Sequence, residues 1–287
     1  MSQHSPLPAP VVQDGVVHAL GLTYSAVVGF RPLKLDFYRP EGTGPFPLVV
    51  QIHGGAFRTG DRAKVPFALE DLFTWLPAQG YAVASISYRL SGEARFPAQV
   101  HDVAAAVRWL RSHADELHLD PQRVALWGQS AGAYLAVMTA LTARHPSWDG
   151  HPDDQPVQAA IDWYGPTDFS LMNAQNAPHG EQDHDAPDSS ESQLIGGPIQ
   201  QHLDAVQRAN PCRYVQADAP SILIQHGTHD QLVPFGQAEV LRDALSAAGA
   251  HVEFHAIAGS PHSFTGHQNP EVLRNTVLEF LDAHLTP

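Results

Sequence analysis

Short apolar runs recur along the chain, each bounded by glycine, proline or charged residues. Their length and their content of β-branched residues predict buried strands. Six such runs are residues 48–52, 82–87, 124–127, 159–164, 222–225 and 252–257. Between some of these runs, apolar residues recur at helical spacing, as in the sets Val100, Val103, Val107, Leu110 and Tyr134, Val137, Met138, Leu141. Strands that alternate with helices predict an α/β fold, with a mostly parallel central sheet flanked by helices on both faces.

Two parts of the chain depart from this alternation. Residues 16–28 and 33–38 look like two strands joined around Gly29 with no helix between them, which predicts antiparallel strands at the N-terminal edge of the sheet. Residues 165–211 carry an acidic run at 181–191 and several loop-forming residues. Long segments of this kind are either lids over a site or plain solvated loops. We expect a single domain over residues 1–287, with a small lid or cap insertion around 165–211.

Composition narrows the class of partner. Acidic residues outnumber basic ones by 30 to 16, and the formal charge of -14 would repel nucleic-acid phosphates. A single cysteine, Cys212, excludes an internal disulfide. No basic region followed by an apolar run opens the sequence, and no stretch reaches the roughly 18 apolar residues that cross a bilayer. We expect a cytoplasmic protein with a small-molecule partner and neither nucleic acid nor membrane; a homodimer stays open.

The strongest local motif is Gly-Gln-Ser-Ala-Gly at residues 128–132. It follows the predicted strand 124–127 and opens the predicted helix around residues 134–141. A nucleophilic serine at a sharp strand-to-helix turn needs flanking glycines, because the backbone is strained and neighbouring chain passes close. The plain alternative is that the glycines only permit a tight turn. The motifs that accompany it favour Ser130 as a nucleophile.

A second motif follows the predicted strand 48–52, where the chain reads His-Gly-Gly-Ala-Phe at residues 53–57. Acyl transfer needs donors aimed at the developing oxyanion, and a glycine-rich turn after a strand can aim backbone amides inward. The expected donors are the amides of Gly55, Ala56 and Ala131. Each such donor typically lowers the barrier by about 3 kcal/mol.

The general base and its orienting acid are expected in loops after later strands. His262 lies in a glycine- and proline-containing loop after the run 252–257, and Asp230 lies in the loop after the run 222–225. The order Ser130, Asp230, His262 is the one that this fold produces. Asp168 and Asp162 compete with Asp230 for the role of the acid.

A metal centre is the weaker interpretation of the same region. His226, His229 and Asp230 are residue types that bind zinc. A metal hydrolase would have no use for a serine turn, however, and the acidic run at 181–191 lacks the glycine and terminal glutamate of a calcium loop. The sequence therefore predicts no metal and no cofactor.

Taken together, these motifs resemble those of the α/β-hydrolase esterases of the hormone-sensitive-lipase and acetyl- and feruloyl-esterase-like branch, with the related kynurenine formamidases. The resemblance covers residues 33–285. It rests on residues 53–57, 96–97, Asp102, Trp109, 120–121, 128–132, 209–211, 226–227, Asp230, 233–234, Gly259 and His262. It implies the same nucleophile, acid and base as the residues themselves. The chain departs from the pattern at Gln129, where such enzymes often carry an acid, and at Ala56, which replaces a third glycine.

This resemblance implies a serine carboxylic-ester hydrolase that acts on short-acyl esters through an acyl-enzyme. The triad does not select the leaving group, so an arylformamidase, an acetyl or feruloyl esterase and an acyltransferase remain alternatives. From a different class, a non-catalytic ligand-binding protein of the same fold would be marked by a missing triad member. None is missing in this sequence.

Overall fold

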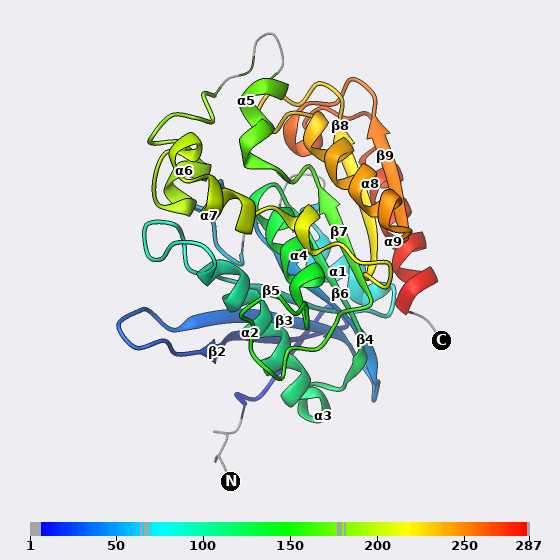
Figure 1. The fold of residues 1–287 in the computed structure, drawn as a ribbon. Coiled ribbons are helices and arrows are strands. Elements are labelled where there is room, and N and C mark those ends of the chain that lie inside the picture. Colours follow the sequence, from blue (N-terminus) through cyan, green and yellow to red (C-terminus); the bar gives the residue numbers. More distant parts are fainter. Residues whose placement is uncertain (1–6, 64, 66–68, 177–179, 181, 286–287) are drawn as a thin grey trace.

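The computed structural model describes residues 7–63, 65, 69–176, 180 and 182–285. They form one nine-stranded sheet with the order β1-β2-β3-β5-β4-β6-β7-β8-β9, flanked by helices (Figure 1). Glu181, the first residue of the expected acidic run, lies outside the described residues, as do residues 1–6. The strands are β1 Val11–Gln13, β2 Val16–Ser25, β3 Leu33–Pro40, β4 Phe46–Ile52, β5 Ala82–Ile86, β6 Leu119–Gln129, β7 Ala159–Trp163, β8 Ser221–Gly227 and β9 Val252–Ile257.

The sheet is antiparallel at one edge and parallel elsewhere. β1, β2, β3 and β5 pair antiparallel in that order, whereas the pairs from β5 through β4 and on to β9 are all parallel. The predicted fold class and the predicted antiparallel edge are therefore confirmed. β1 was not predicted, because a run of three residues is too short to show the periodicity of a strand.

Helices cover both faces of the sheet. They are α1 Leu72–Ala78, α2 Ala98–Ser112, α3 Ala114–Leu117, α4 Ala131–Thr142, α5 Met172–Gln175, α6 Ser190–Ile195, α7 Leu203–Arg208, α8 Gly236–Ala248 and α9 Pro270–Leu285. Because side chains alternate along a strand, Val50 of β4 joins the apolar core under α2, α4 and α8, whereas Val49 joins the core under α1 and α9. These two cores hold the sheet from either side.

Helix α4 is buried over its whole length, although the sequence pattern indicated only one apolar face. All twelve of its residues are buried. The helix packs on β6 and β7 and is covered in turn by α2 and by the 3-10 turn Pro211–Tyr214. The hydroxyl of Tyr134 donates to the carbonyl of Ala209 at 2.7 Å, which fastens this cover to the helix. The helix that begins at Ala131 is therefore packed on all sides.

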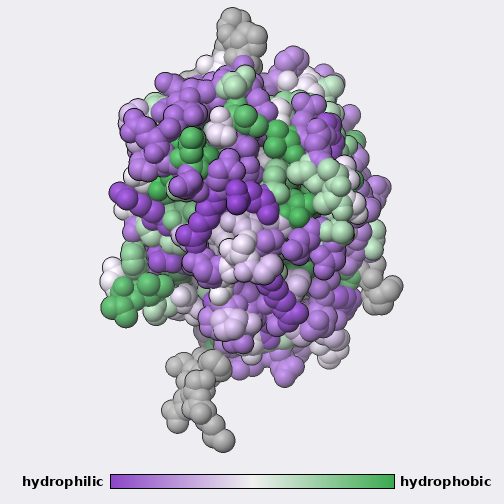
Figure 2. All heavy atoms as spheres, in the orientation of Figure 1, coloured by the Kyte–Doolittle hydropathy of each residue, from purple (hydrophilic) through white to green (hydrophobic). Residues whose placement is uncertain are grey.

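The described residues of the segment 165–211 lie over the carboxyl ends of the parallel strands, with α5 at the top of the view and α6 at its upper left (Figure 1). The visible surface is mainly hydrophilic, with small separate apolar patches (Figure 2). One patch matches the tip of the β2–β3 hairpin, where Val28 and Phe30 are exposed. Among the helices of the described residues, none has the length and apolar content that crossing a bilayer requires.

Candidate active site

Ser130 occupies a strained turn between β6 and α4. Its φ of 52° and ψ of -122° lie in a region that non-glycine residues rarely adopt. The amide of Ser130 donates to the carbonyl of Trp163 at 2.8 Å, which holds the turn against β7. A Cβ on Gly132 would lie 2.0 Å from the carbonyl oxygen of Ile52, and one on Gly128 would lie 2.1 Å from that of Gly132. Neighbouring backbone atoms therefore lie so close to residues 128 and 132 that only glycine fits at either position.

Asp230 and His262 are in direct contact. Nδ1 of His262 lies 2.7 Å from Oδ2 of Asp230, and the other carboxylate oxygen accepts the amides of Leu232 and Val233 at 2.9 Å each. An ionised carboxylate only accepts hydrogen bonds, so Nδ1 is the protonated nitrogen of His262. This tautomer leaves Nε2 as the atom that can accept a proton.

The carboxylate of Asp230 has a second imidazole partner. Nε2 of His226 lies 3.2 Å from Oδ2 of Asp230 and 3.0 Å from the carbonyl oxygen of Val233. Burial alone would raise the pKa of Asp230, but the hydrogen bonds from His226 and His262 outweigh it and hold the pKa well below its ordinary value. Asp230 is therefore ionised at neutral pH.

The loop after β4 passes directly beside Ser130. Three consecutive residues have positive φ, at 117° for Gly55, 54° for Ala56 and 61° for Phe57. A Cβ on Gly55 would lie 2.2 Å from the carbonyl oxygen of Thr59, so no larger residue fits there. Ala131 is the first residue of α4, and the first amides of a helix have no partner within it.

These residues share one cavity of about 780 Å³. Its walls come from the loops after β4, β6, β7, β8 and β9 and from the segment 165–211. Loops at the carboxyl ends of parallel strands meet at one edge of the sheet, which is where α/β proteins bind ligands. Five of the predicted site residues line the cavity, namely Gly55, Ala56, Ser130, Ala131 and His262. Asp230 lies behind His262 and is 3% exposed.

Tyr164 is a site residue that the sequence did not reveal. It follows β7 with a φ of 51° and is buried. Its ring meets the ring of His262 edge-on at a centroid distance of 4.7 Å, and it lines the cavity. The packing restricts how far His262 can turn. No sequence signal marks this role, because it depends on a backbone conformation that tyrosine rarely adopts.

A polar cluster in the cavity wall was also missed. Ser190 and Glu191, at the start of α6, line the cavity and are 3% and 5% exposed. Nδ1 of His184, which is 1% exposed, lies 3.4 Å from Oε2 of Glu191. Within the described part of the chain, Oγ of Ser190 and Nε2 of His184 have no hydrogen-bond partner. Since each unsatisfied buried polar group costs about 1–3 kcal/mol, this wall is suited to a polar ligand.

The two competing aspartates have other partners. Asp168 caps the 3-10 turn Phe169–Leu171, accepting from the amide and hydroxyl of Ser170, and it also accepts from Asn210 at 2.8 Å. Asp162 accepts from the amide of Gly165 at 2.7 Å, and burial raises its pKa to about 6. Because this pKa exceeds the unfolded value of about 3.9, ionised Asp162 lowers stability progressively as the pH rises through 6.

Gln129 belongs to a neutral hydrogen-bonded chain. Its Oε1 accepts from Nε2 of Gln51 at 2.9 Å, and Oε1 of Gln51 accepts from the hydroxyl of Ser85. All three residues are buried. An acidic residue in place of Gln129 would put a buried negative charge next to these neutral side chains, which is energetically costly. The neutral glutamine at this position, where related enzymes often carry an acid, therefore fits its neutral surroundings.

Comparisons with known proteins identify the family and the fold of the chain. Residues 35–245 match the BD-FAE family. The chain is 33% identical over 220 residues to a probable carboxylic ester hydrolase, LipM, of Mycobacterium tuberculosis, covering 75% of this chain and 49% of LipM. With 49%, 56% and 55% of LipM, LipC and LipQ covered, the chain spans about half the length of the curated relatives it matches.

Two solved structures are similar over nearly the whole chain. A truncated carbohydrate esterase from gut microbiota has a TM-score of 0.76 at 26% identity, covering 95% of this chain and 99% of that one. Esterase 2 of Thermogutta terrifontis, phosphonylated by sarin, has a TM-score of 0.72 at 25% identity, covering 100% of both chains. With its sheet order, its serine turn and its matched residues, the chain belongs to the BD-FAE family of α/β-hydrolase esterases.

Proposed function

We propose that this protein is a serine carboxylic-ester hydrolase with Ser130 as nucleophile, His262 as general base and Asp230 as the orienting acid. The observation that carries the proposal is the 2.7 Å contact between His262 and Asp230, on a loop that opens into the same cavity as the strained Ser130. The pattern of nucleophile, base and orienter is what acyl transfer through a covalent intermediate requires.

The proposed reaction has two steps of the same form. Oγ of Ser130 attacks the ester carbonyl while Nε2 of His262 takes its proton, and the oxyanion is bound by the amides of Gly55, Ala56 and Ala131. The C–O bond to the alcohol then breaks, and the alcohol leaves with the proton from His262. Water attacks the acyl-enzyme in the same way, His262 returns its proton to Ser130, and the acid is released.

The ionised carboxylate of Asp230 stabilises the imidazolium that forms in each step. The low pKa of Asp230 supports this role, because the carboxylate keeps its own charge when His262 is protonated. The strain at Ser130 and at the loop after β4 is already present before any substrate binds. The donors therefore need little reorganisation when negative charge develops.

Reaction with a fluorophosphonate probe, which modifies activated serines, tests directly whether Ser130 is a nucleophile. Such a probe should label the protein on Ser130, and His262→Ala should abolish the label because the hydroxyl then loses its base. His229→Ala, a change at an exposed histidine near the same loops, should label like the parent. Mass spectrometry of the digested protein locates the label. A parent that takes no label would favour a ligand-binding protein without catalysis, whereas a His262→Ala protein that labels fully would show that another group activates the serine.

We further propose that the chain is a single domain in which residues 165–211 form a cap over the cavity. Ser190, Glu191 and Gln182 of this segment line the cavity, which supports a cap in contact with the substrate. The guanidinium of Arg58 also donates to the carbonyl of Asp188 across the cavity rim, at 3.4 Å. The proposal includes a cytoplasmic location and a small-molecule ester as partner; light scattering in solution distinguishes a monomer from a homodimer.

The substrate class that we propose is a short-acyl ester of an alcohol that bears further hydroxyl groups. Ser190 and Glu191 line the cavity, and rotation of their side chains would let Oγ of Ser190 and Oε2 of Glu191, which have no hydrogen-bond partner among the described residues, pair with hydroxyl groups of the alcohol. The related esterase from gut microbiota is described as a carbohydrate esterase, and the Thermogutta terrifontis esterase was solved with butyrate bound. Both descriptions agree with a polar alcohol and a short acyl chain.

Glu191→Gln tests this substrate class. The ratio of kcat/KM for an acetylated sugar to kcat/KM for p-nitrophenyl acetate should fall about tenfold or more, because a hydrogen bond to a charged group contributes about 1.5–3 kcal/mol. Glu239→Gln on α8 is the matched control and should leave the ratio unchanged. An unchanged ratio in Glu191→Gln would show that the cluster serves the fold and does not select the alcohol.

A further inference from the structure

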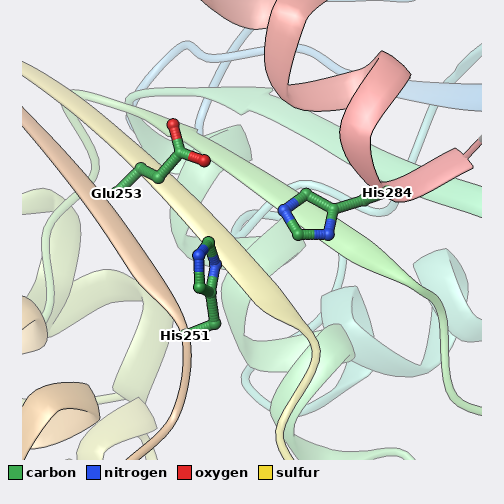
Figure 3. A group of neighbouring side chains, drawn as sticks. All are labelled: His251, Glu253 and His284. Carbon is green, nitrogen blue, oxygen red and sulfur yellow. The ribbon is translucent and has the colours of Figure 1, made fainter.

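A second group of side chains with unusual chemistry lies far from the cavity. His251 immediately precedes β9, Glu253 is the second residue of that strand, and His284 lies in the last turn of α9. One ligand atom from each of the three lies within 4.8 Å of the other two. Figure 3 shows the three side chains, two from the β9 segment and one from the helix, turned toward a shared space.

We propose that His251, Glu253 and His284 bind a divalent transition-metal ion, with zinc as the best-matched ion. Two imidazole nitrogens and one carboxylate oxygen form a ligand set that zinc uses in proteins, leaving a fourth position for water. The site has no part in the ester chemistry: Glu253 and the loop that carries His262 lie toward opposite ends of β9, about 13 Å of strand apart. The ion would fasten the last helix to the edge strand of the sheet.

The local structure presents two of the ligands together. Residues 251 and 253 point to the same face of the strand because side chains alternate. The carbonyl of His251 accepts the amide of Ile222 at 3.1 Å, so the backbone at this point is fixed to β8. Glu253 pairs in register with Leu223 of β8. The ligand positions therefore do not depend on a free loop.

His284 is held in place by packing. Its ring lies 4.6 Å from the ring of Phe280, one helical turn earlier, and 5.1 Å from the ring of His251. Its Nε2 atom is buried and has no hydrogen-bond partner among residues that the structure describes. A buried ring nitrogen left unpaired costs about 1–3 kcal/mol, and coordination to a metal would satisfy it.

Binding requires only a small contraction of the group. With bonds of about 2.1 Å, the ligand atoms of a tetrahedral site lie roughly 3.4 Å apart. The observed limit of 4.8 Å therefore exceeds the bound spacing by little more than an ångström. The exposed His251 and the half-buried Glu253 can make this adjustment by rotating their side chains, while His284 stays in place.

Zinc titration of chelator-treated protein tests the site. A chromophoric competitor should report one zinc ion per chain, and His284→Ala and Glu253→Gln should each weaken zinc binding by at least about tenfold. His255→Ala is the matched control, because His255 lies on the same strand but outside the group; its affinity should equal that of the parent. A parent without a one-to-one site, or variants that bind zinc like the parent, would overturn the proposal.

Thermal unfolding tests the zinc site even in a variant whose fold is less stable. Zinc at about 100 times its Kd should raise the Tm of the parent by several degrees, since it binds only the folded chain. The zinc-dependent shift should vanish in Glu253→Gln, whichever Tm that variant has without metal. A shift of equal size in Glu253→Gln would place the bound zinc elsewhere and contradict the assignment.

Discussion

Ser130→Ala is expected to lower kcat for a short-acyl ester by about 10⁴-fold or more, because the attacking oxygen is removed and only the oxyanion donors and substrate binding remain. Initial rates with p-nitrophenyl acetate measure the loss. Alanine fits the turn as well as serine does, because both carry a Cβ of the same size. The free energy of unfolding should therefore change little, which urea titration checks.

A matched control separates this effect from damage to the fold. Ser91→Ala removes a buried hydroxyl outside the cavity and should leave the rate near that of the parent. If Ser130→Ala retained turnover within tenfold of the parent while keeping its stability, the nucleophile would have to be another group.

Asp230→Asn is expected to lower kcat by about 10⁴-fold at neutral pH. The carboxamide can still accept the amides of Leu232 and Val233 through its oxygen, but its NH₂ group then faces Nδ1 of His262. The imidazole would be held with its proton on Nε2, and this tautomer cannot accept the proton of Ser130. Steady-state kinetics at pH 7 measure the effect.

Asp168→Asn is the control for the proposal that Asp230 is the orienting acid. Asp168 caps a 3-10 turn and has no contact with His262 among its hydrogen bonds, so its amide should reduce the rate by less than tenfold. A large loss in Asp168→Asn, together with a small loss in Asp230→Asn, would reverse the assignment of the acid.

Asp230→Asn should also change how the free energy of unfolding depends on pH. The pKa of Asp230 is held below that of the unfolded chain, so its ionised form stabilises the fold above about pH 4, and this contribution fades as the pH falls further. The stability difference between the parent and Asp230→Asn should therefore be larger at pH 7 than at pH 3. Urea unfolding at the two pH values measures it.

The central strands could be predicted from the sequence because they are buried on both faces and read as continuous apolar runs. β4 and β8 contain the expected runs and extend beyond them. The edge strand β9, which is only partly buried, also spans residues 252–257 as expected. β6 begins five residues earlier than expected, at Leu119, because its first part contains polar residues and Pro121 and pairs irregularly with β4. The local pattern of apolar residues indicates which part of a strand is buried. Hydrogen-bond pairing with the neighbouring strands decides where the strand begins and ends.

The site was predictable where it depends on local geometry. The turn at Ser130 follows from glycines at fixed spacing, and these are needed for contacts within a few residues or with the next strand. His226 and Tyr164 could not be assigned their places, because their contacts with Asp230 and His262 arise only when β7, β8 and β9 lie side by side. Glu191 lies in an acidic run of the segment expected to be a lid, but no local motif marked this glutamate as part of the cavity wall.

The proposed triad is divided between the centre of the sheet and its edge. Ser130 stands between the central strand β6 and the fully buried α4, whereas His262 follows β9, which has a neighbour on one side only. Local fluctuations open sheet edges and loops at lower free energy than central elements. If His262 is the base, it can leave its position in molecules in which the turn at Ser130 is still intact. We therefore expect substitutions that strengthen β9 and its loop to prolong activity during heating more than further packing around Ser130.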